Sequence, residues 1–185
     1  MPLELHHTGT QVISTERLIL RPYRTGDGNA MYKNWASDPE VTRFLSWKTH
    51  QSPAESEDII RTWIETYASE ETYHWGIEYG GELIGDIAVV LANWKHGYFE
   101  IGYSLGRAFW SRGIMSEAVD AVVRHMFKTV GYHRAVIRHD AKNPASGRVA
   151  EKCGFTREGV AREQYLARDG SFRDLVCWGL LDREI

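Results

Sequence analysis

Residues 100–130 read EIGYSLGRAFWSRGIMSEAVDAVVRHMFKTV, and this stretch carries in turn the patterns of a strand, a turn and a helix. Large apolar residues alternate with small or charged ones from Phe99 to Leu105, which is typical of a strand. From Ile114 to Val130 apolar residues recur about every four positions, which predicts a helix with one buried face. Arg112 and Gly113 form the turn between the two elements.

This turn has the composition of an anion-binding site. A strand that leads through a glycine into a helix start directs unpaired backbone N–H groups toward one point, together with the positive end of the helix dipole. Such a point suits a phosphate or a pyrophosphate, and Arg112 adds a cation beside it. An ordinary helix start would show the same residues. The chain contains no G-x-x-x-x-G-K-[ST] motif and no G-x-G-x-x-G after a strand, which argues against a P-loop nucleotidase and a dinucleotide-binding Rossmann unit.

Composition narrows the class of protein. The 185 residues are 43% hydrophobic and 25% charged, as expected of one globular domain, here residues 14–185 after a tail of residues 1–13. The net charge of −3 argues against nucleic acid as a direct partner, and the sequence has no apolar run of the ~20 residues that a membrane span needs. Without a signal-peptide pattern, and with only Cys153 and Cys177, we expect a cytoplasmic protein that holds no metal.

The remaining elements surround the central stretch. We expect helices over 29–38, from Pro53 to about Tyr67 and over 144–153, and strands over 17–23, 72–79, 82–91, 133–139, 155–167 and 171–181. The order is β-α-α-β-β-β-α-β-α-β-β. A strand, a crossover helix and a strand form a right-handed unit, so strands 99–105 and 133–139 should be parallel neighbours. The sequence predicts an α/β (mixed α+β) domain, with a mixed sheet of about seven strands flanked by about four helices.

Six segments in this order resemble the GNAT N-acetyltransferases, in particular the ribosomal-protein-alanine N-acetyltransferase branch (RimJ/RimL-like). The segments are ERLILRPY, GELIGDIAV, EIGYSL, WSRGIMSEA, NPASGRVAEKCGF and RDGSFRDLVCWGLL, and the resemblance covers residues 16–181. It implies the GNAT fold, in which two parallel strands splay apart at the centre of the sheet. The family's pyrophosphate loop is written [RQ]-x-x-G-x-[GA]. This chain keeps Gly113 but has Trp110 at the first position of the motif and Met115 at the last. We expect Met115 to narrow the space beside the phosphates.

The resemblance also implies acetyl-CoA as co-substrate and a primary amine as acceptor, most naturally the α-amino group of a protein or peptide N-terminus. The pyrophosphate would lie on the backbone of Arg112, Gly113, Ile114, Met115 and Ser116. The pantetheine arm would lie along Tyr103, Ser104 and Leu105 and face Asn143 and Ser146, and Arg148 and Lys152 would contact the 3′-phosphate.

Two residues are candidates for the chemistry. Glu100 could deprotonate the amine, directly or through a water, because partial burial would raise the pKa of its carboxyl group. It could equally pair with a nearby arginine or hold a strand bulge. Ser146 could donate a hydrogen bond or a proton to the leaving sulfur, or it could cap the helix that begins at Pro144.

Two other functions remain open at this point. The acceptor could be a small amine, such as a polyamine, an aminoglycoside or an amino acid. The protein could also be a sensor that binds CoA without catalysis, a reading that rests on Trp110 and Met115. The sequence is compatible with a monomer or a homodimer.

Overall fold

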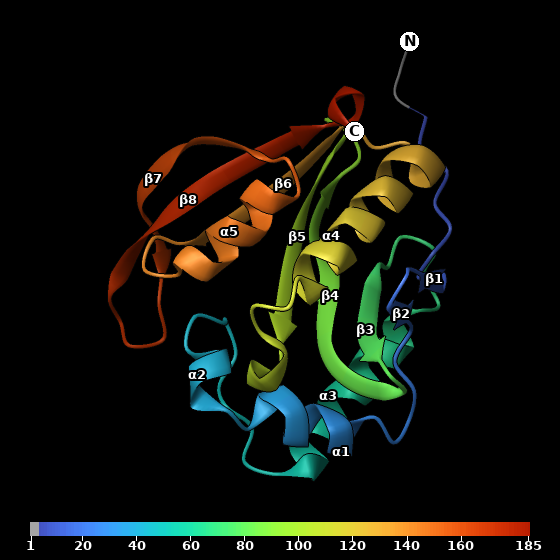
Figure 1. Cartoon of the computed structure of the whole chain (residues 1–185), viewed down its shortest axis with the longest axis vertical. Helices are drawn as coiled ribbons and strands as arrows, with labels where there is room; N and C mark the ends of the chain where they lie inside the picture. Colours follow the sequence, from blue (N-terminus) through green and yellow to red (C-terminus); the bar gives the residue numbers. More distant parts are fainter. Residues whose placement is uncertain (1–3) are drawn as a thin grey trace.

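A computed structural model describes residues 4–185, which form one mixed sheet with helices on both faces (Figure 1). The strands are β1 (Ile13–Ser14), β2 (Leu18–Arg21), β3 (His74–Tyr79), β4 (Glu82–Asn93), β5 (Tyr98–Leu105), β6 (Arg134–Asp140), β7 (Thr156–Leu166) and β8 (Phe172–Leu181). Their order in the sheet is β1-β2-β3-β4-β5-β6-β8-β7, and β5 and β6 are the parallel pair among otherwise antiparallel neighbours. The predicted mixed sheet and its central parallel pair are confirmed.

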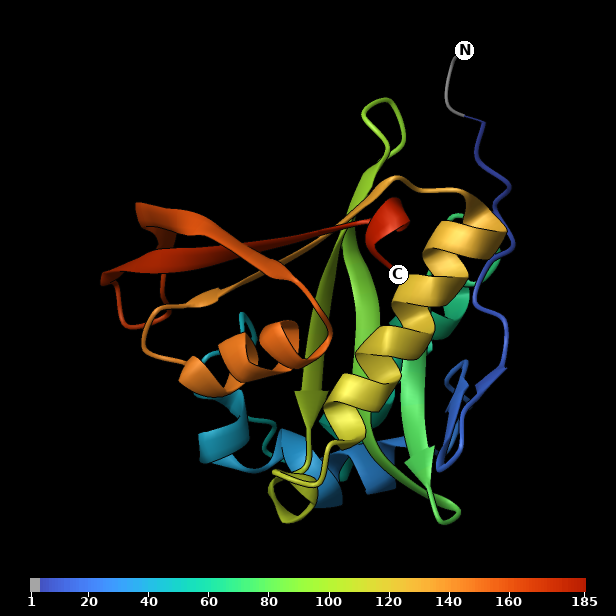
Figure 2. The ribbon, with the colours of Figure 1, turned by 45° about the horizontal axis from the view of Figure 1, so that its top comes forward.

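The helices divide between the two faces. They are α1 (Gly28–Met31), continued by a π-helical segment (Tyr32–Ala36), α2 (Pro39–Thr42), α3 (Pro53–Thr66), α4 (Ile114–His125), continued by a second π-helical segment (Met126–Val130), and α5 (Pro144–Lys152). Figures 1 and 2 show α4 and α5 on one face of the sheet, whereas α1 and α3 pack behind it. The predicted start of α3 is confirmed, since the Ser52 side chain accepts a hydrogen bond from the Glu55 backbone N–H.

Two hydrophobic clusters fill the space between these layers. The larger lies under α4 and includes Val119 and Val122, both fully buried, as the apolar stripe of this helix predicts. The smaller lies under α1 and α3 and is centred on Trp35 and Ile60, also fully buried. Burial of both faces fixes the sheet between its helices.

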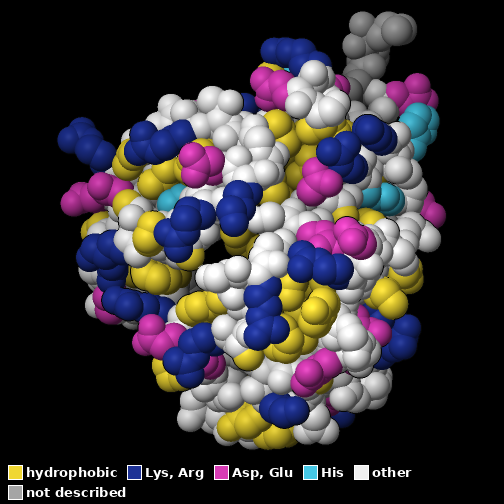
Figure 3. Space-filling model, in the orientation of Figure 1, with side chains coloured by type: hydrophobic (Ala, Val, Ile, Leu, Met, Phe, Trp, Pro, Cys, Tyr) yellow, Lys and Arg dark blue, Asp and Glu magenta, His cyan; other side chains and the backbone are white. Residues whose placement is uncertain are grey.

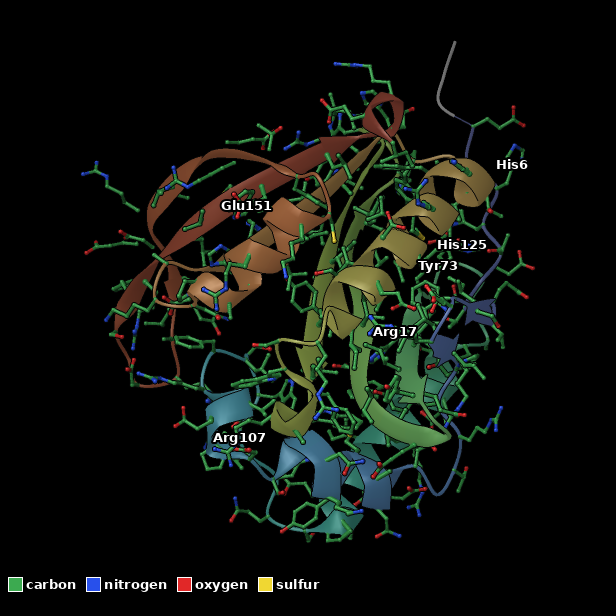
Figure 4. The ribbon with its side chains drawn as sticks, in the orientation of Figure 1. His6, Arg17, Tyr73, Arg107, His125 and Glu151 are labelled. Atoms are coloured by element: carbon green, nitrogen blue, oxygen red, sulfur yellow. The ribbon has the colours of Figure 1, made fainter. Side chains whose placement is uncertain are left out.

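Residues 4–12 of the predicted tail lie along the domain beside α4, and residues 1–3 are outside the described part. The His6 backbone N–H donates to Val130 at 2.8 Å, and the Thr8 N–H donates to the Tyr73 hydroxyl at 3.2 Å. Figure 4 shows Tyr73 close to His125 on this side of the molecule. The chain then pairs Ile13–Ser14 with β2, which adds an eighth strand to the seven that the sequence predicts.

The parallel strands β5 and β6 pair over a short distance and then diverge. Their register covers Tyr98↔Arg134, Phe99↔Ala135 and Glu100↔Val136. On its other side β5 pairs with β4, and this register shifts between Val89 and Leu91. Val90 is therefore an extra residue in β4. A bulge bends and twists the strand pair that contains it. The bulge therefore lies at the level where β6 leaves β5.

Gly102 accommodates this bulge. A Cβ atom at position 102 would lie 2.7 Å from Val90 Cγ1, closer than real Cβ contacts. We predict that Gly102→Ala lowers the free energy of unfolding by about 1–3 kcal/mol through overpacking. Val90→Ala in the same chain should restore most of the loss, because it removes the contacted methyl group. Urea unfolding of the wild type, both single variants and the double variant measures this; a double variant no more stable than Gly102→Ala would contradict it.

Candidate active site

A cavity of about 580 Å³ occupies the opening between β5 and β6. Its walls are residues 101–105 of β5, residues 137–140 of β6, the turn before α4, one side of α5 as far as Lys152, and residues between 40 and 45 in and after α2. Figure 3 shows a hollow between α5 and the start of α4, with Lys and Arg side chains around it. Five Lys or Arg residues and two Asp or Glu residues line the cavity, in a protein whose net charge is −3. The site is therefore suited to an anionic ligand.

The turn before α4 points its backbone into this cavity. Ser111 and Gly113 have positive φ angles, 61° and 76°, and Gly113 is the residue that precedes the first helical turn. The first backbone N–H groups of a helix have no partner within the helix. Gly113, Ile114, Met115 and Ser116 all line the cavity. The structure thus brings the predicted anion-binding turn to the wall of the site.

Glu117 fixes this turn to the edge of the sheet. Its carboxylate accepts hydrogen bonds from the Thr15 hydroxyl at 2.5 Å and from the Arg17 backbone N–H at 3.0 Å, and it forms an ion pair with the Arg17 guanidinium at 2.7 Å. Figure 4 shows Arg17 beside the start of α4. Partial burial would raise the pKa of Glu117, but the hydrogen bonds from Thr15 and Arg17 outweigh it and hold this pKa below its usual value.

Arg112 and Trp110 make further contacts that stabilise the turn, and Trp110 also lines the cavity. The Arg112 carbonyl accepts a hydrogen bond from Arg17 Nη1 at 3.1 Å, and the Arg112 guanidinium lies 5.7 Å from the centre of the Phe109 ring. Its side chain is not part of the cavity wall. The Trp110 indole donates to the Leu105 carbonyl at 2.7 Å, which ties the turn to the end of β5 and occupies that carbonyl. Trp110 thus has a structural role at the position where the family motif has Arg or Gln.

Met115 belongs to the core as well as to the cavity. Its side chain is 6% exposed, and it packs in the larger hydrophobic cluster. Cys153, from the end of α5, lies close by and donates its thiol hydrogen to the Ser116 carbonyl at 3.3 Å. Burial raises the pKa of the Cys153 thiol to about 12, so it is protonated at neutral pH and is a poor nucleophile.

Helix α5 supplies the opposite wall through Asn143, Ser146, Arg148 and Lys152. The Asn143 side chain caps no backbone N–H of α5. The Ser146 hydroxyl lies 2.8 Å from the Tyr103 hydroxyl, so it pairs with a side chain of β5 rather than serving as the cap of α5. In the part of the chain that the structure describes, Arg148 and Lys152 have no carboxylate within ion-pair distance.

Glu100 is located beside the cavity but is not part of its wall. Its Oε2 atom accepts from Arg138 Nε at 2.9 Å and from Arg138 Nη2 at 2.5 Å, and the pair raises the pKa of Arg138. Arg138 itself lines the cavity. Arginine pairing was the alternative role that the sequence left open for Glu100. The base role of Glu100 stays a prediction.

The segment around α2 closes the far end of the cavity. Val41, Arg43 and Phe44 line it, and Arg168 Nη2, from the loop between β7 and β8, donates to the Thr42 carbonyl at 2.8 Å. Four large aromatic residues, Trp35, Phe44, Trp47 and Trp94, differ in their relation to the cavity. Only Phe44 among them lines the cavity; Trp35 is fully buried, and Trp94 is 69% exposed.

The contacts that Asp86 makes with Ser104 and His74 are not indicated by any local sequence pattern. Asp86 lies across from Ser104 in the β4–β5 register and accepts a hydrogen bond from its hydroxyl at 2.5 Å. His74 Nε2 lies 3.1 Å from the other carboxylate oxygen of Asp86. Alternation places each residue on a face of its strand, but their contact depends on the pairing of three strands, which no local pattern contains.

Two further findings concern residues 4–185. They contain no group of three or more His, Cys, Asp or Glu residues arranged to hold a metal ion. They also contain no helix with the length and apolar character needed to cross a membrane.

Comparison with known proteins identifies the class. The profile of the GNAT acetyltransferase domain matches residues 17–156, so the chain belongs to the GNAT acetyltransferases and is an acetyltransferase enzyme. Enzymes of this family take the acetyl group from acetyl-CoA. YoaA of Bacillus subtilis, an uncharacterized N-acetyltransferase, is 35% identical over 174 residues, which are 92% of this chain and 96% of YoaA.

Two other matches are informative. The [ribosomal protein uS5]-alanine N-acetyltransferase of Escherichia coli is 38% identical over 80 residues, which are 43% of this chain and 41% of that enzyme. The crystal structure of a GNAT acetyltransferase from Bacillus anthracis has a TM-score of 0.82 at 22% identity and covers 94% of this chain and 100% of its own. The latter shows that the two proteins share a fold.

Glu117 generates a stability prediction. Because the pKa of its carboxyl group is lowered in the folded state, Glu117 contributes to the free energy of unfolding at neutral pH. This contribution is lost as the pH falls through that lowered pKa. We expect Glu117→Gln to lower the free energy of unfolding at pH 7 by about 1–3 kcal/mol, the range for hydrogen bonds to charged groups. The difference from the wild type should begin to shrink as the pH falls below about 4.3, where the carboxyl group of the unfolded chain becomes protonated, and should vanish below the lowered pKa of the folded state.

The matched control is Asp120→Asn, on the same helix. Asp120 pairs with Arg124 at 2.8 Å, but both side chains are about half exposed, at 48% and 47%. Such a pair contributes about 0.3–0.5 kcal/mol. Urea unfolding at several pH values compares the variants; equal small effects of both substitutions would contradict the anchoring role of Glu117.

Proposed function

We propose that the protein transfers the acetyl group of acetyl-CoA to the α-amino group of a protein or peptide N-terminus, by direct attack in a ternary complex in the cytoplasm. The observation that carries the proposal is the cavity between β5 and β6, which joins a basic, anion-binding end to an apolar end under α2. The match to the uS5-alanine N-acetyltransferase supports this acceptor class over the matched part of the chain.

The basic end suits the nucleotide part of acetyl-CoA. We assign the pyrophosphate to the backbone N–H groups of residues 113–116, with Arg112 contributing through its backbone. We assign the 3′-phosphate to Arg148 and Lys152, which lie one helical turn apart on α5 and both face the cavity. These cations need no rearrangement of existing ion pairs to receive a phosphate.

The exposed edge of β5 suits the pantetheine arm. Residues 101–105 pair with β4 along one edge and lie beyond the last paired position with β6 on the other. Alternate backbone groups of Tyr103, Ser104 and Leu105 are therefore placed to form sheet-like hydrogen bonds with an amide-containing ligand. The Leu105 carbonyl is the exception, because Trp110 already donates to it. The Asn143 side chain faces the same space from α5.

Ser146 and Tyr103 are placed to assist the leaving group. Their hydroxyl oxygens lie 2.8 Å apart, so one hydroxyl can donate to the other and leave a second hydrogen for the sulfur. Burial raises the pKa of Tyr103 well above its usual value, so its hydroxyl remains protonated. We propose that Ser146, held by Tyr103, donates a hydrogen bond to the developing thiolate.

The apolar end favours an α-amine over a polycation. Val41, Phe44 and Leu45 line it, together with Glu40 and Arg43, whose side chains form an ion pair at 4.0 Å. A polyamine or an aminoglycoside would be expected to need several carboxylates. An α-amino group with a pKa near 7.7 is about one-sixth neutral at pH 7, whereas a lysine near 10.4 is neutral in about one molecule in 2,500. An N-terminal acceptor therefore needs modest help from a base. For Glu100, the pair with Arg138 supports a role in holding the cavity wall.

The proposal is tested by calorimetric titration of acetyl-CoA, followed by free-thiol release with a panel of amines. The panel contains peptides with a free N-terminal alanine or serine, polyamines, aminoglycosides and amino acids. Thiol release with the peptides is the expected result. Release with one small-amine class alone would contradict the peptide acceptor. Binding without release on any amine would favour the CoA sensor.

The phosphate assignment gives a sharper prediction. We expect wild-type protein to bind acetyl-CoA more tightly than acetyl-dephospho-CoA, which lacks the 3′-phosphate. Arg148→Ala combined with Lys152→Ala should weaken acetyl-CoA binding about tenfold or more and leave acetyl-dephospho-CoA binding nearly unchanged, because two unpaired cations are lost from one phosphate. Calorimetry measures all four affinities.

Lys128→Ala is the control, since Lys128 is an exposed helical lysine outside the cavity wall. It should bind both ligands as the wild type does. An equal loss for the two ligands in the double variant would place the 3′-phosphate elsewhere.

A further inference from the structure

Ser104, Asp86 and His74 form a chain of hydrogen-bonding groups that leads from the cavity into the sheet. Ser104 lines the cavity and is 7% exposed. Its hydroxyl donates to Asp86 Oδ1 at 2.5 Å, and His74 Nε2 lies 3.1 Å from Asp86 Oδ2. The three residues belong to β5, β4 and β3, which lie side by side in Figure 1. We refer to them as the Ser104–Asp86–His74 array.

The strand registers place the array on one face of the sheet. Asp86 is directly opposite Ser104 on one side and Gly76 on the other. His74 is two residues from Gly76, so its side chain is on the same face and reaches Asp86 diagonally. Gly76 has no side chain to separate them. This is the face covered by α1 and α3.

Tyr103 and Ser104 are consecutive in β5 and therefore project to opposite faces. Tyr103 contacts Ser146 of α5 on one face, whereas Ser104 contacts Asp86 on the other. Both residues line the same cavity, since it occupies the gap beyond the last paired position of β5 and β6. The two residues thus border one cavity, with their hydroxyl groups on opposite faces of β5.

Asp86 has no competing basic partner. In the described part of the chain, its ion-pair contact is with His74, and no Lys or Arg lies within 4.0 Å of its carboxylate. Glu100, the other carboxylate near this part of β5, is occupied by Arg138. The two oxygens of Asp86 therefore contact a hydroxyl and an imidazole rather than a fixed cation.

The groups that face the array are mostly neutral or already paired. The His74 ring lies 4.3 Å from the Trp63 ring and 5.3 Å from the Tyr23 ring, centre to centre, and the Tyr67 hydroxyl donates to the His74 carbonyl. Burial raises the pKa of Tyr67 to about 12 and that of Tyr23 well above its usual value. The charged groups nearby are Arg21, Asp27 and Glu78, which form ion pairs with one another.

We propose that the Ser104–Asp86–His74 array accepts the proton that the acceptor amine loses during acetyl transfer; this inference rests on the proposed function. The amine N–H bond breaks as a Ser104 Oγ–H bond forms, and the original Ser104 hydrogen passes to Asp86 Oδ1. His74, with a hydrogen on Nε2, donates to Asp86 Oδ2 throughout and orients the carboxylate. The proton on Asp86 returns to solvent after product release. Ser104 is the group that contacts the amine, and His74 is a positioning residue.

The variants Ser104→Ala, Asp86→Asn and His74→Gln test this in the full-length protein, with acetyl-CoA and a peptide that begins with alanine. We expect kcat at pH 7 to fall about 100-fold for Asp86→Asn, at the lower end of the range for general acid–base catalysis, and less for the other two. The dissociation constant of acetyl-CoA should change less than twofold. The losses should shrink as the pH rises from 7 to 9, since the peptide amine then becomes neutral without a base.

If the array had only a structural role, the substitutions would lower kcat by the same factor at every pH, and the loss would follow the decrease in the free energy of unfolding. This result would overturn the proposal. The control variants are His133→Gln and Asp182→Asn, a histidine–aspartate pair at 3.0 Å that is half exposed and outside the cavity wall. Both should keep wild-type activity. Glu100→Gln is compared with them: a pH-dependent loss in that variant, with full activity in Asp86→Asn, would assign the base to Glu100.

Wild-type activity separates this inference from the proposed function. If the wild type acetylates a small amine but not the peptide, the acceptor assignment fails, and the same variants are assayed with that amine. If the wild type releases no thiol with any amine of the panel, both proposals are contradicted.

Discussion

The divergence of β5 from β6 is the constraint on which the rest of the site depends. The two strands pair at three positions that end with Glu100 and Val136, and beyond them each strand has an edge that faces the cavity. The β4 bulge at Val90, tolerated because residue 102 is glycine, lies at this level. The opening therefore begins at the level of a local irregularity in the neighbouring strand.

The opening also distributes the chemical groups. The crossover helix α4 begins at the end of β5, so its free N–H groups reach the cavity through the turn at Gly113, and Glu117 fixes that turn to the sheet edge. Helix α5 follows β6 and brings its Arg148–Lys152 row to the other side. Because side chains alternate between the two faces along β5, the Tyr103 hydroxyl lies on one face and the Ser104 hydroxyl on the other. One strand end is thus surrounded by the groups to which we assign anion binding, leaving-group donation and proton acceptance.

The sequence predicted what local patterns encode. The apolar stripe of residues 114–130 predicts helix α4, and the composition of the turn predicts its start after Gly113. The handedness of the crossover predicts that β5 and β6 are parallel neighbours. It could not predict contacts set by strand register. Whether Ser146 caps α5 or meets Tyr103 depends on how far α5 lies from β5. The pairing of Glu100 with Arg138 depends on the register of β5 with β6, and that of Ser104 with Asp86 on the register of β5 with β4.

Amide hydrogen exchange with and without acetyl-CoA tests the central claim, that the open edge of β5 and the turn before α4 bind the co-substrate. Residues 101–105 and 113–116 line the cavity. The account predicts that exchange in peptides covering these two segments slows on binding, while β7 and β8, at the far edge of the sheet, are unchanged. Saturating acetyl-CoA with no slowing in residues 101–105 would contradict it.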